Sequence, residues 1–459
     1  MNIIESLVKE SLEFEPPELK PRSEIIRALP TPKLFNTYHI VVGMRRSGKT
    51  FYLFQKMRQL LENGVDRDTI FYFNFSDDRL KPLVPGMGSA IIEEYYRQVP
   101  SARDQGAYFL LDEIQELGDW QAILQRVSEH EKATMVVTGS SSKLSSEEIA
   151  TQSRGRSQSH LMLPLSFLEY CSFAGEGALA RDVSGITGIG AVSQRDATRL
   201  SGLFSSYLIA GGFPGVQDLI PEDRIEMLQG YVRDVVARDV AERSGRGDIA
   251  LANQLALFAL RNTGCDLSLN KLAEQLSDLG YQAYWKKLND LSHLMEQAYL
   301  YRLLPEFTMR LKPSTTAQQK VYAIDPGLVH AVSRASQQDL GKRFETVIYL
   351  ELVRRLAGRR IETVSSYTVP SPRREKVDFL VGDALSREPY ELVQACADMS
   401  SDKTRSRELG SLSLAMRAVG LDCGKIITLD EEGTEHVEGG TIDIVPAWRW
   451  ILTSSNRQS

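Results

Sequence analysis

The chain has 459 residues, of which 42% are hydrophobic and 25% are charged, enough for about two or three ordinary globular cores. A formal net charge of −6 argues against a protein that coats nucleic acid by overall charge, although it is compatible with local basic patches. The first ten residues carry acids where a secretory signal needs an apolar core, and no run reaches membrane-spanning length, so we expect a cytoplasmic protein with no membrane partner.

Residues 1–37 are expected to form an arm that precedes the first domain. A short helix opens the arm, and the proline-containing segment Glu15–Pro21 then predicts extended backbone. A second helix is predicted around Ser23–Ala28.

Residues 43–50 read Gly-Met-Arg-Arg-Ser-Gly-Lys-Thr, between a strand-like run at 38–44 and a helix-like run at 51–61. In such a loop, glycines let backbone N–H groups surround phosphates, Lys49 adds a positive charge, and the Thr50 hydroxyl can hold Mg²⁺. The following helix directs its positive end at the same phosphates. We therefore predict that ATP and Mg²⁺ bind here, with contacts from Gly43, Arg45, Arg46, Ser47, Gly48, Lys49, Thr50 and Phe51.

Two acids follow the apolar run at 107–111, which predicts a buried strand. In nucleotide hydrolases with a phosphate loop, an aspartate at this place helps to hold Mg²⁺, and we assign that role to Asp112. Glu113 then becomes the candidate general base that polarises the attacking water. By themselves, two acids after a strand would be read as a solvated strand end; their pairing with the upstream loop favours catalysis.

Three more strands complete the predicted sheet, at 69–75, 133–142 and 159–165. With those at 38–44 and 107–112 they predict an α/β fold with a five-stranded parallel sheet and short connections. The strand from 133 runs into hydroxyl residues, where Thr138 or Ser140 could sense the γ-phosphate.

These motifs and several later ones resemble those of prokaryotic AAA-like ATPases whose C-terminal half is a domain of unknown function. The matching segments are 43–50, Leu110–Gln115 with Trp120, Thr138–Ser141, Gly155–Arg156, Pro164–Phe167 with Glu169, Gly211–Pro214 and Val321–Asp325. The resemblance covers nearly the whole chain after residue 35. It implies an AAA-type ATPase domain, a winged-helix segment and a C-terminal region similar to the PD-(D/E)xK nuclease fold, but no settled biological role.

The related ATPases place an arginine before the last core strand, where it can act on the nucleotide of a neighbouring subunit. The resemblance therefore implies this role for Arg156, provided that the chain forms a homo-oligomer.

Helical spacing at 193–210 and 221–243, interrupted by Gly211–Pro214, is typical of a helical lid on an AAA module. Arg233 and Arg238 alternate with Asp234 and Asp239 on the second helix. One of these arginines could reach the γ-phosphate; ion pairing on a solvated helix face is an equally open alternative.

The middle segment predicts a helix-turn-helix followed by a wing. Its predicted helices are 267–276 and 282–295, and its predicted strand pair is Tyr299–Leu304 with Lys320–Ile324. Such modules place the second helix in the major groove of DNA. However, Asp266–Arg302 contains four basic and five acidic residues, a net charge of −1, so phosphate attraction should be weak and packing between domains remains the alternative.

The C-terminal region predicts a helix at 341–356 and strands at 376–381 and 390–395, an order that suggests a restriction-endonuclease-like scaffold with Glu345, Asp378 and Glu391 as candidate acids. Hydrolysis by such a site needs carboxylates for Mg²⁺ and a lysine. That lysine is missing: Val393 stands two residues after Glu391, and if Gln394 occupies the lysine position, then Leu392 replaces the acid. We therefore favour a degenerate nuclease fold kept for binding over one that cuts.

Two further features of this region stay open. Between Lys342 and Lys376 there are nine basic and four acidic residues, a net charge of +5 that suits a nucleic-acid patch or a solvated helix face. Residues 444–448 are expected to form a last strand or a docking segment.

The predicted domains are thus the arm at 1–37, an ATPase core and helical lid at 38–245, a winged-helix-like segment at 246–335 and a nuclease-like domain at 336–459. Three functions remain open. The first is an ATP-hydrolysing switch that acts on its winged-helix and C-terminal domains, with DNA as partner. The second is a metal-dependent DNA nuclease coupled to ATP, and the third is a nucleotide-gated module that recognises a protein.

Overall fold

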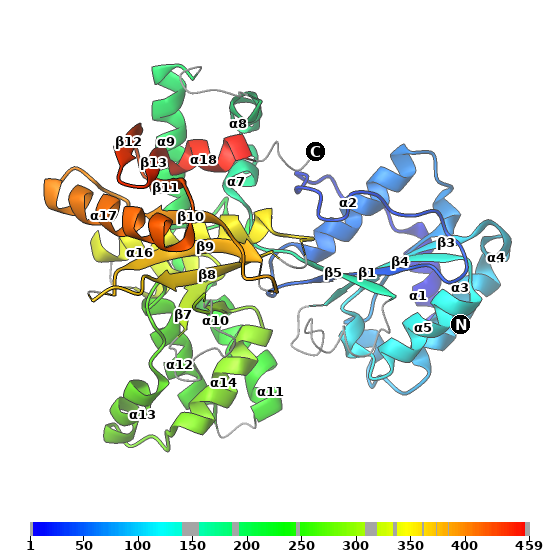
Figure 1. Ribbon diagram of the computed structural model, residues 1–459. Helices are drawn as coiled ribbons and strands as arrows, with labels where there is room; N and C mark the ends of the chain where they lie inside the picture. Colours follow the sequence, from blue (N-terminus) through cyan, green and yellow to red (C-terminus); the bar gives the residue numbers. More distant parts are fainter. Residues whose placement is uncertain are drawn as a thin grey trace. The chain divides into compact units, whose positions relative to one another are not determined.

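The structure is a computed structural model that describes residues 3–139, 156–185, 192–244, 248–307, 319–333, 337–359, 362–372, 374–383 and 385–454. The chain divides into two compact units, Met1–Leu163 and Pro164–Ser459, and Figure 1 follows it from blue to red. The helices that we assigned to a lid belong to the second unit by this division. The four predicted domain boundaries stay predictions.

The first unit contains the predicted five-stranded sheet, in the order β2-β3-β4-β1-β5 with parallel neighbours throughout. Its strands are β1 (Tyr38–Val42), β2 (Ile70–Asn74), β3 (Ala107–Asp112), β4 (Ala133–Gly139) and β5 (Ser157–Leu161). Its helices are α1 (Ile3–Glu13), α2 (Lys49–Glu62), α3 (Met87–Gln98), α4 (Ala102–Gln105) and α5 (Trp120–His130), with short 3-10 turns η1 (Arg67–Thr69), η2 (Asp78–Leu80) and η3 (Ile114–Glu116). The last strand begins and ends earlier than predicted. Its end comes before Pro164, which has no N–H to donate to a ladder.

Both faces of this sheet are covered, which explains why its strands read as nearly continuous apolar runs. On one face, Tyr52, Leu53 and Met57 of α2 pack against alternate strand residues such as Leu110 and Val136. On the other face, Tyr95 of α3 contacts the rings of Phe71 and Phe109, with centroids 4.6 and 5.5 Å away.

The arm differs from its prediction. Ser23–Ala28 is not helical but follows an irregular path, because side chains of α2 bind its backbone. The Tyr52 hydroxyl accepts from Ile26 N at 2.9 Å, and Lys56 Nζ donates to Ile26 O at 2.8 Å. These bonds use backbone groups that a helix would need for itself.

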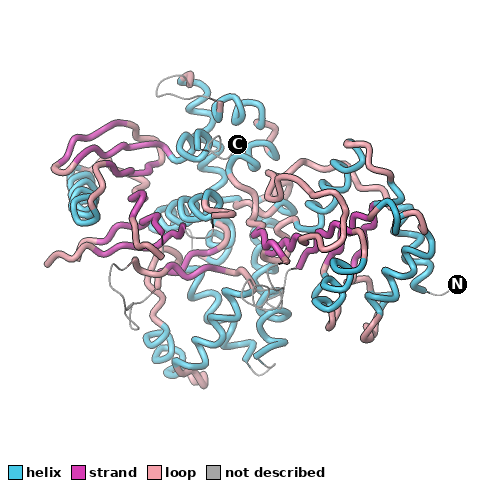
Figure 2. The backbone as a smooth tube through the Cα atoms, turned by 45° about the vertical axis from the view of Figure 1, so that its right-hand side comes forward, coloured by secondary structure: helices cyan, strands magenta, loops and turns pink. Residues whose placement is uncertain are grey.

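The second unit combines helices with a six-stranded mixed sheet, whose strands are among the magenta segments on the left of Figure 2. Its strands are the ribbon β6 (Tyr301–Leu304) and β7 (Lys320–Ala323), and the sheet strands β8 (Glu362–Thr368), β9 (Lys376–Asp383), β10 (Pro389–Ala395), β11 (Cys423–Thr428), β12 (Gly433–Val437) and β13 (Gly440–Pro446). Its helices are α7 (Phe167–Phe173), α8 (Gly177–Ser184), α9 (Gln194–Ala210), η5 (Pro214–Val216), α10 (Pro221–Asp234), the π-helical η6 (Val235–Val240), α11 (Ala241–Ser244), α12 (Ile249–Arg261), α13 (Leu269–Asp278), α14 (Trp285–Gln297), α15 (Pro326–Val332), α16 (Gln337–Arg355), α17 (Asp402–Val419) and α18 (Ala447–Ser454).

The six strands are ordered β12-β13-β11-β10-β9-β8. Neighbours β10 and β11 are parallel because α17 connects them as a crossover, whereas β8, β9 and β10 pair antiparallel. Leu412 and Met416 of α17 pack against Leu392 and Ile426 of the sheet. The segment predicted as a last strand ends β13 and then begins α18.

The predicted ribbon of the middle segment is confirmed: β6 and β7 pair antiparallel, with Tyr301 opposite Ala323. The helices α13 and α14 before it also lie where we expected helices, although α14 starts at Trp285 rather than at 282.

Asp325 connects two motifs of the sequence. Its carboxylate caps α15 by accepting from Gly327 N at 2.8 Å, and it accepts from Gly212 N at 2.6 Å. A side chain on Gly211, whose φ is 72°, would place a Cβ 2.1 Å from this carboxylate, so a glycine is required there.

Candidate functional site

The loop Gly43–Thr50 runs from the end of β1 into the first residues of α2. Gly43 and Gly48 have φ values of 152° and 101°, which side-chain-bearing residues rarely adopt. A Cβ on Gly43 would also lie 2.3 Å from Met162 O. Both observations require glycine at position 43, and they show that the loop closes against the residues just after β5.

The charged and polar side chains of this loop turn inward. Lys49 is 4% exposed, and its ammonium donates to Gly43 O and Met44 O, each at 2.9 Å. Ser47 Oγ is buried and has no hydrogen-bond partner among the residues that the structure describes. A buried hydroxyl without a partner is costly, so a ligand that bonds to it would stabilise the loop.

Asp112 lies beside this loop because the parallel strands end at one edge of the sheet, with Asn74 opposite Asp112 and Val41 opposite Thr138. Thr50 Oγ1 donates to Asp112 Oδ2 at 2.8 Å, and Thr138 Oγ1 donates to Asp112 Oδ1. Carboxylate and hydroxyl oxygens are ligands that Mg²⁺ prefers, so this pair fits the expected ion.

The environment of Asp112 is dry, since the residue is 1% exposed. Burial raises the pKa of its carboxyl above the ordinary value, and hydrogen bonds from Thr138 and Thr50 oppose that shift. Tyr72 on β2 also approaches, with its hydroxyl 3.4 Å from Asp112 Oδ2. The sequence placed Tyr72 on a strand but did not suggest a role in the site, since strand pairing alone decides which tyrosine faces the acid.

Glu113 follows directly, in the left-handed backbone region with φ of 52°. Its backbone N–H donates to Thr138 Oγ1 at 3.1 Å, and Gln115 Nε2 donates to its carboxylate. Thr138 therefore contacts both acids. Gln115, which sequence reasoning did not single out, holds the Glu113 side chain.

Other predicted residues are placed less centrally. Phe51 is 53% exposed on the first turn of α2, and Arg46 is also exposed. Ser140 lies outside the described residues. Arg233 lies in the last turn of α10 and Arg238 lies in η6, both in the second unit, so a sensor role for either stays a prediction.

Arg156 precedes β5, at the amino-terminal edge of the sheet, whereas the loop Gly43–Thr50 leaves the carboxyl-terminal edge. Its guanidinium pairs with Glu129 and lies 5.8 Å from the centre of the Phe35 ring. Arg156 is therefore not part of its own chain's nucleotide loop. Its action on another subunit remains a prediction.

Arg22 of the arm was missed by sequence reasoning, because it belongs to no motif. Its guanidinium donates to Ser47 O at 2.7 Å and to Leu163 O at 2.9 Å. The Gln55 side chain of α2 binds both backbone polar groups of Arg22, at 2.7 and 2.9 Å. The arm is thus attached to the loop and to the last residue of the first unit.

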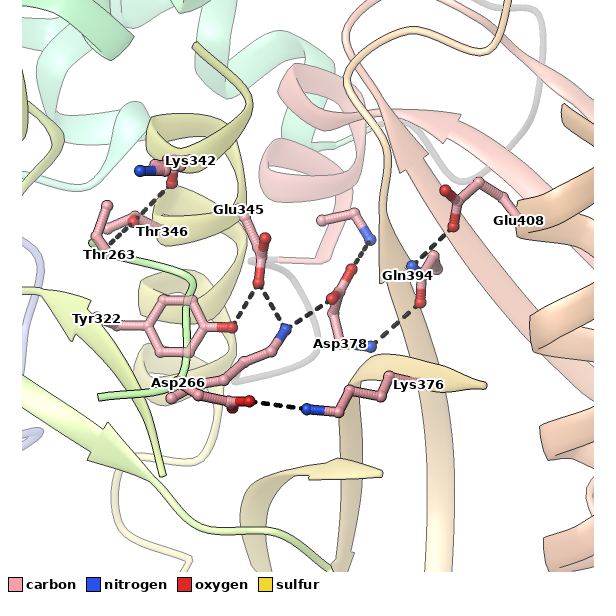
Figure 3. A network of polar contacts seen from close by, with 12 residues as sticks. Thr263, Asp266, Tyr322, Lys342, Glu345, Thr346, Lys376, Asp378, Gln394 and Glu408 are labelled. Atoms are coloured by element: carbon pink, nitrogen blue, oxygen red, sulfur yellow. Dashed lines mark hydrogen bonds and ion pairs between the residues drawn. The ribbon is translucent and has the colours of Figure 1, made fainter. Parts of the chain in front are cut away.

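A second polar cluster in the other unit contains two of the three predicted C-terminal acids (Figure 3). Glu345 and Asp378 both accept from Lys320 Nζ, at 3.0 and 2.9 Å. The expected third acid is absent from the cluster: Glu391 instead pairs with Lys425 at 2.5 Å. Successive residues of a strand face opposite sides, so Glu391 and Gln394, three residues apart on β10, point to different faces. Gln394 is the one that faces Asp378, and it accepts from Asp378 N at 3.1 Å.

Comparison with known proteins places this geometry in context. Residues 36–171 match the family described as AAA domain, and residues 201–339 match Domain of unknown function (DUF8612). An uncharacterized protein of Methanocaldococcus jannaschii is 28% identical over 459 residues, covering 98% of this chain and 95% of that protein. An uncharacterized protein of Haemophilus influenzae is 27% identical over 318 residues, covering 69% of this chain and 74% of that one.

Among solved structures, a Walker-type ATPase of Pyrococcus abyssi is 12% identical, with a TM-score of 0.40 over 72% of this chain and 95% of that chain. The AAA domain match covers the residues that carry the phosphate loop and the parallel sheet with Asp112 at its edge. In the described part of the chain, no helix has the length and apolar character needed to cross a bilayer.

Proposed function

We propose that this protein binds ATP with Mg²⁺ at Gly43–Thr50, hydrolyses it, and uses the nucleotide state as a switch on the regions after residue 163. The observation that carries the proposal is the pair of oxygens on Thr50 and Asp112, 2.8 Å apart, with the buried Lys49 directly before Thr50 in the chain. The AAA domain match over residues 36–171 supports it.

In this proposal, Mg²⁺ neutralises negative charge on the phosphates when it is bound. Thr50 and Asp112 supply oxygen ligands to it. Lys49 exchanges its two carbonyl partners for phosphate oxygens, and Ser47 Oγ gains a partner. The N-terminus of α2 adds its positive end to the same place.

Glu113 is proposed to orient and polarise the attacking water. Its position next to Asp112 and the hydrogen bond from Gln115 to its carboxylate support this role. Thr138 holds Asp112 and the backbone of Glu113 in fixed relation, and we propose that it also responds to the γ-phosphate.

Two variants test the proposal. Lys49→Ala should abolish ATP binding in calorimetry, whereas Glu113→Gln should keep binding and lower turnover by about 10²–10⁴-fold, the usual contribution of a general base. Normal turnover by the Gln variant would remove Glu113 from its role. Absence of ATP binding by folded wild type would refute the function altogether.

We further propose that DNA is the partner of the switch, through a winged helix made of α12–α14 and the ribbon β6–β7. Exposed side chains at the start of α14 support this: Tyr284 is 58% exposed, Trp285 is 52% exposed, and Lys286 is exposed beside them. The start of the second helix is where such modules contact bases. The C-terminal domain is proposed to be nuclease-like and to serve in binding.

DNA-dependent turnover tests this partner. Lys286→Ala should reduce stimulation of ATP hydrolysis by DNA. Lys287→Ala should keep most of this stimulation, because the ammonium of Lys287 is already paired with Asp248 at 2.5 Å. No stimulation of wild type by any DNA form would favour a protein partner instead. The net charge of −1 over this segment and the 73% exposure of Leu279 support that second candidate, which a nuclease-resistant, ATP-dependent pull-down would identify.

A further inference from the structure

The cluster in Figure 3 brings three elements of the second unit together. Lys320 and Tyr322 are two residues apart on β7 and so share one face of the ribbon. Glu345 comes from α16 and Asp378 from β9. The sequence separates Lys320 from the acids by 25 and 58 residues, so no local motif announces the contact.

One ammonium satisfies both acids. Lys320 Nζ lies 3.0 Å from Glu345 Oε1 and 2.9 Å from Asp378 Oδ1. Each carboxylate accepts one further hydrogen bond. The Tyr322 hydroxyl donates to Glu345 Oε1 at 2.6 Å, and Ala395 N donates to Asp378 Oδ2 at 3.1 Å.

These residues do not fit the divalent cation that a nuclease of this design would require. Such an ion needs to lie about 2.0–2.6 Å from several oxygens, and the ammonium occupies the position between the two carboxylates. The ammonium is therefore what excludes the ion, and on β10 Gln394, which donates to Glu408 at 2.8 Å, faces Asp378 in place of an acid. Within the described ranges, no group of three or more His, Cys, Asp or Glu side chains could hold a metal.

The two acids keep the Lys320 ammonium charged in a buried place. The side chains of Lys320, Glu345 and Asp378 are 11%, 18% and 13% exposed. Burial by itself would lower the pKa of Lys320, but Asp378 and Glu345 outweigh it and raise that pKa above its ordinary value. Burial raises the pKa of Glu345, with the Asp378 charge adding to the shift and Lys320 opposing it.

We infer that the Lys320 ammonium takes the place of a divalent cation. The cluster is then a metal-independent ion-pair network that holds β7 to α16 and β9, and not a cleavage centre. This inference does not depend on the ATPase proposal. Its consequence is that removal of the ammonium leaves two buried acids that a divalent cation can bridge.

Mn²⁺ binding to nucleotide-free protein, followed by electron paramagnetic resonance, tests the inference. Wild type, Asp378→Asn and Glu345→Gln should bind equal amounts of Mn²⁺, because neither acid holds a metal. Lys320→Met keeps the apolar stem without the charge, and it should bind an additional Mn²⁺ equivalent that the double variant with Asp378→Asn loses.

Thermal unfolding gives a second measurement. Mn²⁺ should raise the Tm of Lys320→Met but not that of Lys376→Met, a control that removes the neighbouring, half-exposed lysine paired with Asp266 at 3.0 Å. Less Mn²⁺ on Asp378→Asn or Glu345→Gln than on wild type would overturn the inference, and so would a Lys320→Met protein that gains none. If Lys320→Met does not fold, the wild-type comparison with the two acid variants decides alone.

Discussion

At the residue scale, Asp112 depends on hydroxyl groups from three different elements. Thr50 on α2, Thr138 on β4 and Tyr72 on β2 all direct their hydroxyls at its carboxylate. These hydrogen bonds offset part of the cost of removing the charge from water, since hydrogen bonds to a charged group contribute about 1.5–3 kcal/mol each. If Asp112 holds Mg²⁺ as proposed, turnover should be sensitive to the loss of one of these hydroxyls.

Thr138→Val should therefore lower ATP turnover by about 10–100-fold, the rate equivalent of one such hydrogen bond. Because Thr138 does not belong to the phosphate loop, ATP affinity should change little. Steady-state kinetics together with calorimetry measure both quantities. Thr138→Ser keeps the hydroxyl and should restore most turnover; equal loss in both variants would assign Thr138 to packing instead.

His39 and His160 make a second residue-scale prediction, because their ring nitrogens Nδ1 and Nε2 lie 3.0 Å apart on neighbouring strands. Burial, with the His160 and Lys56 charges adding to it, lowers the pKa of His39 from 6.5 to about 4. Below pH 6.5 the His39 ring takes up a proton in the unfolded chain, whereas in the folded chain it stays mostly neutral until the pH nears 4. The free energy of unfolding should thus fall by about 3 kcal/mol as pH drops from 6.5 to 4.

Hydrogen exchange of β1 amides between pH 6.5 and 4, corrected for intrinsic rates, measures this loss locally. His39→Gln removes the titrating ring and should flatten the dependence. A wild-type opening energy that does not change over this range would contradict the prediction.

At the element scale, the arm at residues 1–37 contacts the phosphate loop although its sequence carries no motif. It has no regular structure after α1 apart from short turns, yet Arg22 joins the phosphate loop at Ser47 to the strand exit at Leu163. Met162 also touches the start of that loop, since it blocks any Cβ on Gly43. A shift of the loop on nucleotide binding would thus reach the residues that lead into the second unit.

Arg22→Ala should weaken ATP binding about 10-fold or more, because two hydrogen bonds from a charged group to the loop and strand exit are lost. Arg22→Lys should recover part of the affinity, since an ammonium can replace one of them. Arg58→Ala is the matched control, because Arg58 donates to Pro17 O of the same arm at 3.4 Å and should leave affinity unchanged. Calorimetric titration with ATP distinguishes the variants, and equal affinity of Arg22→Ala and wild type would exclude this role.

At the scale of the whole molecule, the position of Arg156 decides what assembly could add. The arginine lies at the sheet edge opposite the nucleotide loop of its own chain, so it can reach an ATP molecule only in another copy. An arginine supplied in this way raises turnover by orders of magnitude in related chemistry.

Mixing two inactive variants tests that assembly. Lys49→Ala is expected to lose ATP binding but keeps Arg156, and Arg156→Ala keeps an intact loop. A mixture should therefore recover part of the wild-type turnover that neither variant is expected to have alone. Turnover assays combined with mass measurement in solution give the result. An active Arg156→Ala variant, or a wild type that is active as a monomer, would exclude the arginine from catalysis in trans.

By itself, the sequence determined the elements that depend on neighbouring residues. The octet at 43–50, the five strands and the acids at 112 and 113 could be identified because glycine conformation, apolar runs and strand-end acids are local properties. The prediction of a helix at Ser23–Ala28 was wrong because a non-local contact decides this segment: Tyr52 and Lys56 of a distant helix bind its backbone.

Only the tertiary structure decided which side chains meet. Tyr72 reaches Asp112 because their strands pair. Arg22 reaches the phosphate loop because the arm at residues 1–37 passes beside it. Lys320 reaches Glu345 and Asp378 from the separate ribbon β6–β7. Glu391 was excluded from that cluster because the two-residue period of a strand turns it to the opposite face from Gln394. Such contacts are set by chain topology and burial, which join residues without regard to their distance along the sequence.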